Sequence, residues 1–74
     1  MERAVVTVWS DKGVLSRLVV PLGEGDGLEG LARECLGSAV EMYRRSTAVD
    51  QPKPLFAVAV RGDERVRVEA QGLV

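Results

Sequence analysis

The alternation of apolar and polar residues divides the chain into two strand pairs separated by one amphipathic segment. β-branched, aromatic and other apolar residues dominate residues 4–9 and 14–20 in the first half, and 55–61 and 65–70 in the second. Such composition is typical of strands. Between the pairs, apolar residues recur three and four positions apart over about residues 26–46, which predicts a helix. The sequence therefore predicts an α+β fold of order ββαββ, a four-stranded sheet with the helix on one face.

The first strand pair is predicted to be a hairpin closed by Asp11, Lys12 and Gly13. A type I turn followed by a left-handed Gly closes many three-residue loops, and this loop places Trp9 opposite Leu15. This register places Ala4, Val6 and Val8 with Ser16, Leu18 and Val20 on the face that we expect to pack on the helix. The face away from the helix is also mostly apolar, whereas a solvated face should alternate with polar residues. We expect a protein partner to cover its large apolar side chains, Val5, Trp9, Leu15 and Val19.

The helix carries start signals and surface charge pairs. Asp26 is the expected N-cap, because Glu29 follows at the spacing of a capping box. Two pairs lie four positions apart in the favourable orientation, Glu29–Arg33 and Glu41–Arg45. Cys35 falls on the apolar stripe and is expected to be a packing residue, because no His is present to activate it.

The second strand pair has two possible registers. An odd-numbered turn places one apolar set on the buried face, Phe56, Val58, Val60, Val66, Val68 and Ala70. A two-residue turn at Gly62-Asp63 instead mixes valines with arginines on both faces. Burial favours the first register and Gly-first turn chemistry favours the second. We predict the first, which brings Arg61, Arg65 and Arg67 together on the outer face with Glu69, Leu55, Ala57 and Ala59.

The order and spacing of these elements resemble the β-grasp domains, the fold of ubiquitin and its relatives. The resemblance lies in the N-terminal hairpin that starts from Met1 and the capped helix near residue 26. The chain departs from that family at its end, Gln71-Gly72-Leu73-Val74, which lacks the Gly-Gly used for conjugation and sulfur transfer. The competing arrangement is a hairpin–helix–hairpin sandwich whose sheet pairs with a second copy.

Composition limits the chemistry. With 74 residues, we expect one domain with a small core. A single Cys and no His exclude an intramolecular disulfide and a zinc site of the favoured ligands, so oligomerisation or a partner is the remaining stabilising device. Ten basic and eleven acidic residues give a net charge of −1, which does not favour nonspecific attraction to nucleic acid or membranes.

The sequence also bears on location and source. No apolar run spans a membrane and no signal peptide is evident, so we expect a cytoplasmic protein. Ile, Asn and His are absent, and eight Arg stand against two Lys. This bias fits a GC-rich coding sequence, such as that of an actinobacterium, a phage or a mobile element.

Two short motifs match functional signatures but are better explained structurally. Gly25–Gly30 matches G-x-G-x-x-G, but its own carboxylates would repel a dinucleotide. Arg61-Gly62-Asp63 is a turn in a chain without a secretion signal. No pair of carboxylates is placed for acid–base catalysis. We therefore expect no enzyme activity, no cofactor and no metal.

The leading hypothesis is a non-enzymatic protein–protein interaction module, a homodimer or an adaptor to a larger protein. The alternative is a small nucleic-acid-binding regulator that grips phosphates with arginines of the sheet and the helix end. The arginines expected for that role are Arg61, Arg65, Arg67, Arg44 and Arg45.

Overall fold

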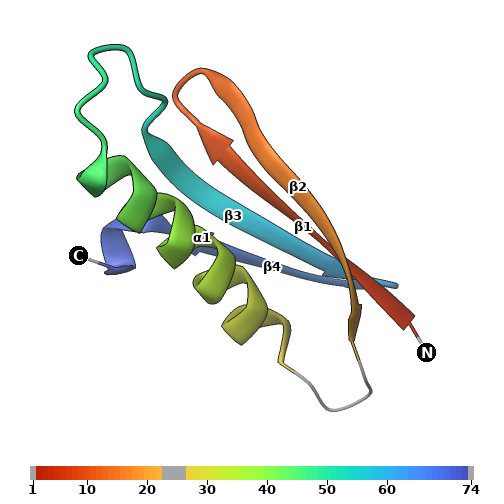
Figure 1. Cartoon of the computed structure of the whole chain (residues 1–74). Helices are drawn as coiled ribbons and strands as arrows, with labels where there is room; N and C mark the ends of the chain where they lie inside the picture. The colour runs from red at the N-terminus through yellow and green to blue at the C-terminus, as the bar shows by residue number, and fades with distance from the viewer. Residues whose placement is uncertain (1, 23–26, 74) are drawn as a thin grey trace.

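The computed structural model describes residues 2–22 and 27–73, which form one antiparallel sheet with a helix packed on it (Figure 1). In chain order the elements are β1 (Glu2–Ser10), β2 (Gly13–Leu22), α1 (Leu28–Arg45), β3 (Pro54–Arg61), β4 (Glu64–Glu69) and a short 3-10 helix, η1 (Ala70–Leu73). The strand order is β2-β1-β3-β4, so β1 and β3 are central while β2 and β4 are edges. The predicted α+β class and ββαββ order are confirmed.

The β1–β2 hairpin has the predicted pairing except near its turn. Up to Val8 the residues pair as expected, but a register shift then places Trp9 opposite Val14 rather than opposite Leu15. Leu15 is therefore the extra, unpaired residue of a β-bulge on β2, close to the hairpin turn. Gly13 has a φ of 110°, the positive value that the sequence predicted at this position.

The β3–β4 hairpin adopts the register that we did not predict. Arg61 pairs with Glu64 around a two-residue turn at Gly62-Asp63. Gly62 has a φ of 57°, as a turn with Gly in first position requires. As a result Ala57 and Ala59, expected on the outer face, are completely buried under the helix. Local turn geometry therefore outweighed the simple count of apolar side chains.

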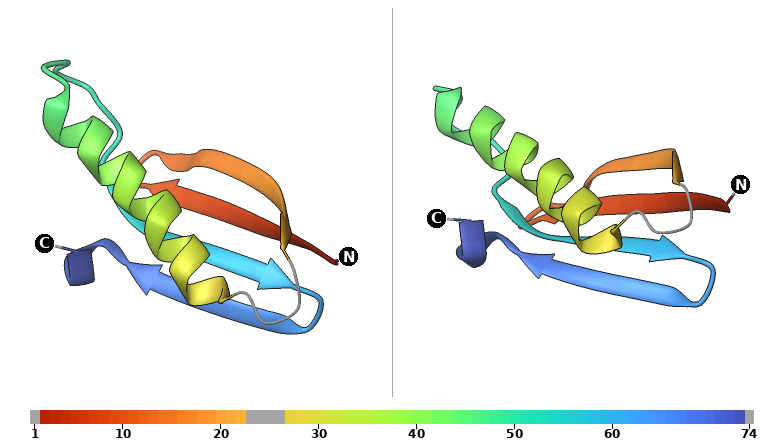
Figure 2. Two further views of the ribbon diagram at one scale, coloured as in Figure 1. Left: turned by 60° about the horizontal axis from the view of Figure 1, so that its bottom comes forward. Right: turned by 90° about the horizontal axis from the view of Figure 1, so that it is seen from below.

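The helix lies diagonally across the sheet and packs on β3, β4 and β1 (Figure 2). Its buried residues are Leu28, Ala32 and Leu36, which repeat every fourth position. The sheet residues that complete this core are Ala4, Val6, Val8, Ala57, Ala59 and Val68. The alanines on the sheet let the helix approach closely, and the largest fully buried side chains are Leu36 of the helix and Val6 and Val8 of the sheet.

The helix start differs from the prediction by one residue. α1 begins at Leu28 with Gly27 as N-cap, and among the described residues no side chain donates or accepts a capping hydrogen bond there. Asp26, the predicted cap, lies outside the described residues. Both predicted ion pairs form, at 3.6 Å and 3.9 Å between guanidinium nitrogen and carboxylate oxygen, Glu29–Arg33 and Glu41–Arg45.

The turn between β1 and β2 is tied to the segment that connects α1 with β3. The Asp11 carboxylate accepts a hydrogen bond of 2.9 Å from the backbone N–H of Lys53. The Asp11 N–H donates in return to the Lys53 carbonyl at 3.1 Å. Lys12 Nζ donates to the Asp50 carbonyl at 2.6 Å. These bonds join residues about forty positions apart and fix the hairpin tip relative to the end of the helix.

Candidate functional site

The helix α1 covers one face of the sheet, and we call the opposite face, on which no other described element packs, the open face (Figure 2). Strand pairing arranges it in three rows that run across the strands: Val19–Val5–Val60–Arg65, Arg17–Thr7–Val58–Arg67 and Trp9–Phe56–Glu69. Arg3, opposite Pro21, extends the same face along β1. The open face is therefore apolar along its central strands and carries arginines on β1, β2 and β4.

An aromatic pair lies on the two central strands of the open face. The rings of Trp9 and Phe56 stack with centroids 6.1 Å apart and planes inclined by 18°. The Arg67 guanidinium lies over the Phe56 ring, 3.9 Å from its centroid, a favourable cation–π arrangement. Glu69 Oε1 accepts a hydrogen bond of 2.7 Å from Arg67 Nε, which holds the guanidinium in that position.

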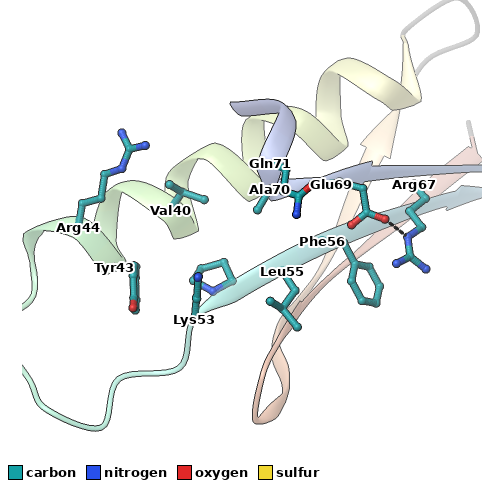
Figure 3. A pocket seen from close by; sticks show the side chains of 11 residues that line it. Val40, Tyr43, Arg44, Lys53, Leu55, Phe56, Arg67, Glu69, Ala70 and Gln71 are labelled. Carbon is teal, nitrogen blue, oxygen red and sulfur yellow. Dashed lines mark hydrogen bonds and ion pairs between the residues drawn. The ribbon is translucent and has the colours of Figure 1, made fainter. Parts of the chain in front are cut away.

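A pocket of about 530 Å³ adjoins the aromatic pair where β3 and β4 meet the second half of α1 (Figure 3), and we call it the end pocket. Phe56, Arg67 and Glu69 line both the open face and this pocket. On the helix side, Tyr43 and Arg44 form its wall. Lys53 and Arg44 add two positive charges to that of Arg67, against the single carboxylate of Glu69.

The predicted partner-binding residues are divided between two environments. Leu15 and Val19 are exposed, Val19 at 53%. Val5 and Trp9 are half-buried among the side chains of the open face. The helix does not bury the opposite side of β2 either, because Leu18, which we expected to lie under the helix, is 50% exposed. Strand β2 is therefore exposed on both of its faces, which the sequence did not indicate.

The arginines predicted for nucleic-acid binding do not form one cluster. Arg61 and Arg65 point to opposite faces, because the two-residue turn reverses the predicted register. Arg61 is buried to 9% exposure and bonds Glu64 Oε1 at 3.0 Å. Arg65 and Arg67 share the open face. Arg44 joins Arg67 in the end pocket, while Arg45 pairs with Glu41 on the helix.

Cys35 is positioned as a packing residue. It is half-buried against the core and lines a cavity of about 310 Å³ between α1 and β2. Burial and the neighbouring Glu34 raise the pKa of its thiol, so little thiolate forms at neutral pH. This environment does not favour a nucleophilic role.

Within residues 2–22 and 27–73, no group of three or more His, Cys, Asp or Glu side chains could hold a metal ion. The part of the chain that the structure describes contains no helix long and apolar enough to cross a membrane. The G-x-G-x-x-G match falls partly outside these residues, and its Gly27 is the helix N-cap.

Comparison of the chain with protein-family models, with curated proteins and with solved structures gives no match. The resemblance to β-grasp domains consequently rests on the order of elements alone. Any function must therefore be argued from the surfaces of this chain.

Sequence reasoning missed the aromatic pair and the end pocket. Both combine residues from distant segments, and Phe56 was assigned to the buried face together with its register partners. The Gly62-Asp63 pair in the sequence could have indicated the correct face of β3, because the turn at these residues sets the register that places Phe56 beside Trp9.

Proposed function

We propose that this protein is a non-enzymatic interaction module that acts as a homodimer, in which two copies join along β2. The supporting observation is that residues 14–19 of this strand are all exposed although most are apolar. A long apolar edge strand presents unpaired backbone donors and acceptors and favours the addition of another strand.

The two edges of the sheet differ in the way this proposal requires. β4 has six residues, and most of them are charged, ERVRVE. Short, charged edge strands resist pairing with other chains. β2 has ten residues, GVLSRLVVPL, and Arg17 is its only charge. The charges of β4 thus hinder pairing with another strand, whereas the edge of β2 remains available for such pairing.

Self-pairing about a twofold axis suits the side chains of β2. Antiparallel pairing centred on Leu18 places this residue beside its own copy and Arg17 beside the partner's Val19, so the two arginines are not directly opposed. Covering the exposed halves of Val14, Leu15, Leu18 and Val19 in both copies contributes about 6–12 kcal/mol before the cost of association. That cost is about 4–15 kcal/mol, so we expect a dimer that dissociates on dilution.

Sedimentation velocity over a micromolar to submillimolar range tests the dimer. The wild-type chain is expected to reach twice the mass of one chain, and Leu18→Lys is expected to remain monomeric with unchanged circular dichroism. Leu18 is half exposed, so a lysine there is tolerated by the folded monomer. Val49→Lys is the matched control, because Val49 is 98% exposed in the connection after the helix and does not belong to β2.

A wild-type chain that stays monomeric at the highest concentration contradicts the proposal. So does a Leu18→Lys variant that dimerises as well as Val49→Lys. If Leu18→Lys fails to fold, Val14→Lys repeats the test at a second exposed position of the same strand.

A further inference from the structure

Charge is unevenly distributed over the surface of this protein. The chain as a whole carries a net charge of −1. By strand register the open face nevertheless holds four arginines against one carboxylate, Arg3, Arg17, Arg65, Arg67 and Glu69. Since Arg67 already bonds Glu69, the charges of Arg3, Arg17 and Arg65 are those that an incoming anion would meet first.

The arginines surround an aromatic centre. Trp9 and Phe56 lie on the adjacent central strands with nearly parallel rings. Arg17 and Arg67 occupy the same row on opposite edges of the sheet, roughly 14 Å apart at three strand spacings. A ligand that crosses the sheet between them passes beside the aromatic pair.

The end pocket continues this surface. Phe56 and Arg67 line both, and Arg44 and Lys53 add positive charge on the far side of the pocket (Figure 3). Its volume of about 530 Å³ lies in the range of sites that hold small molecules. The positively charged surface therefore runs from Arg17 on β2 across the aromatic pair to Arg44 on the helix. Glu69 is the one carboxylate of the open-face rows that lies along it.

Three occupants can be compared by their chemistry. A second copy stacked face to face would bring the arginines of both copies together with one carboxylate each, which is repulsive. An acidic peptide would satisfy the arginines but offers few planar groups to the aromatic pair. A single-stranded nucleic acid supplies both phosphates and planar bases. A four-stranded sheet with aromatic residues on its surface is a known platform for such strands.

We propose that the open face and the end pocket bind single-stranded nucleic acid. Phosphates lie against Arg17 and Arg65 on the two edge strands, and a base stacks on Trp9, because the Arg67 guanidinium already lies over the Phe56 ring. The end pocket accepts a further nucleotide beside Arg44 and Lys53. This proposal does not rest on dimerisation along β2, because all of these residues belong to one copy.

Trp9 is the only tryptophan, so its fluorescence reports directly on the proposed site. We expect oligothymidylate at low salt to quench this emission, and the affinity to fall as salt rises. Arg17→Gln and Arg65→Gln should each weaken binding at least about fivefold and lower the salt slope by about 0.7. Phe56→Leu should also weaken binding at least about fivefold, because it removes the ring that holds Trp9 in its stacking position.

The matched control is Arg33→Gln, which removes an exposed arginine from the helix on the other side of the sheet. It should leave the affinity unchanged. Circular dichroism of each variant establishes that the fold is intact. Should Phe56→Leu fail to fold, Arg17→Gln and Arg65→Gln still test the site, because both side chains are exposed.

Several outcomes overturn the proposal. One is no binding of oligothymidylate at low salt, and another is equal weakening by Arg33→Gln and Arg17→Gln. Binding of polyglutamate with the same affinity would assign the surface to an acidic protein instead. Tighter binding of duplex DNA than of the single strand would exclude the stacking arrangement.

Discussion

Two glycines inside the helix give the most direct test of the structure. Gly30 and Gly37 lie within α1, and a Cβ atom added at either position meets no atom within 4 Å. Alanine is therefore sterically accepted at both positions. In a helix interior, Gly is less favourable than Ala by about 1 kcal/mol, because it loses more backbone freedom on folding.

The magnitude for the double variant follows from simple addition. The two positions are seven residues apart, about 10 Å along the axis, so their effects should be nearly independent. Gly30→Ala with Gly37→Ala should raise the free energy of unfolding by about 2 kcal/mol. For a chain of this size the melting temperature should rise by roughly 8–16 °C.

Urea denaturation followed by circular dichroism measures this change, with an unchanged m-value as a check on two-state unfolding. Gly13→Ala is the control, because a Cβ there also meets nothing within 4 Å but φ is 110°. It should destabilise the protein by about 1–2 kcal/mol. Loss of stability in the helix double variant would refute the assignment of both glycines to an open helix surface.

Three smaller predictions follow from local contacts. Gly27→Asp should raise the free energy of unfolding by a few tenths of a kcal/mol, because the N-cap has the extended backbone that Asp favours there but makes no side-chain hydrogen bond. Urea denaturation measures this change, and a decrease would contradict the assigned helix start. Asp11→Ala should cost about 1 kcal/mol in the same assay, through loss of the bond from Lys53 N–H; Asp63→Ala, in the other hairpin turn, is the comparison. Cys35 should react with iodoacetamide more slowly than a free cysteine derivative at neutral pH. Its rate should approach the free value only as pH rises towards the raised pKa, because the thiolate is the reactive form; equal rates at neutral pH would contradict the assigned burial.

Local patterns were sufficient for the elements and for part of their pairing. Alternation along residues 4–8 identified which side of β1 faces the helix, and Ala4, Val6 and Val8 are buried as expected. The predicted ion pairs on the helix also form, because residues four positions apart are neighbours on any helix surface. Both features depend only on the geometry of one element.

The register of the second hairpin was predictable in principle but was weighed incorrectly. Val58 and Val60 appeared to require burial under the helix, whereas the turn at Gly62 places both on the open face, where Val58 is 9% and Val60 37% exposed. One step in register exchanges the two faces of a strand. This choice decided which side of β3 and of Arg61 faces the helix, and so the composition of the open face, whereas Arg65 and Arg67 lie on the outer face as predicted.

The sequence by itself determined the order of the elements, the turn glycines and the absence of the residues needed for disulfide or His/Cys zinc chemistry. Only the tertiary structure decided that the helix packs towards β3 and β4 and leaves β2 exposed. It also decided that Trp9 stacks on Phe56 and that Arg44 shares a pocket with Arg67. The physical reason is that these contacts join segments far apart in the chain. They depend on strand order and on the close approach of the helix to small residues, which no local pattern records.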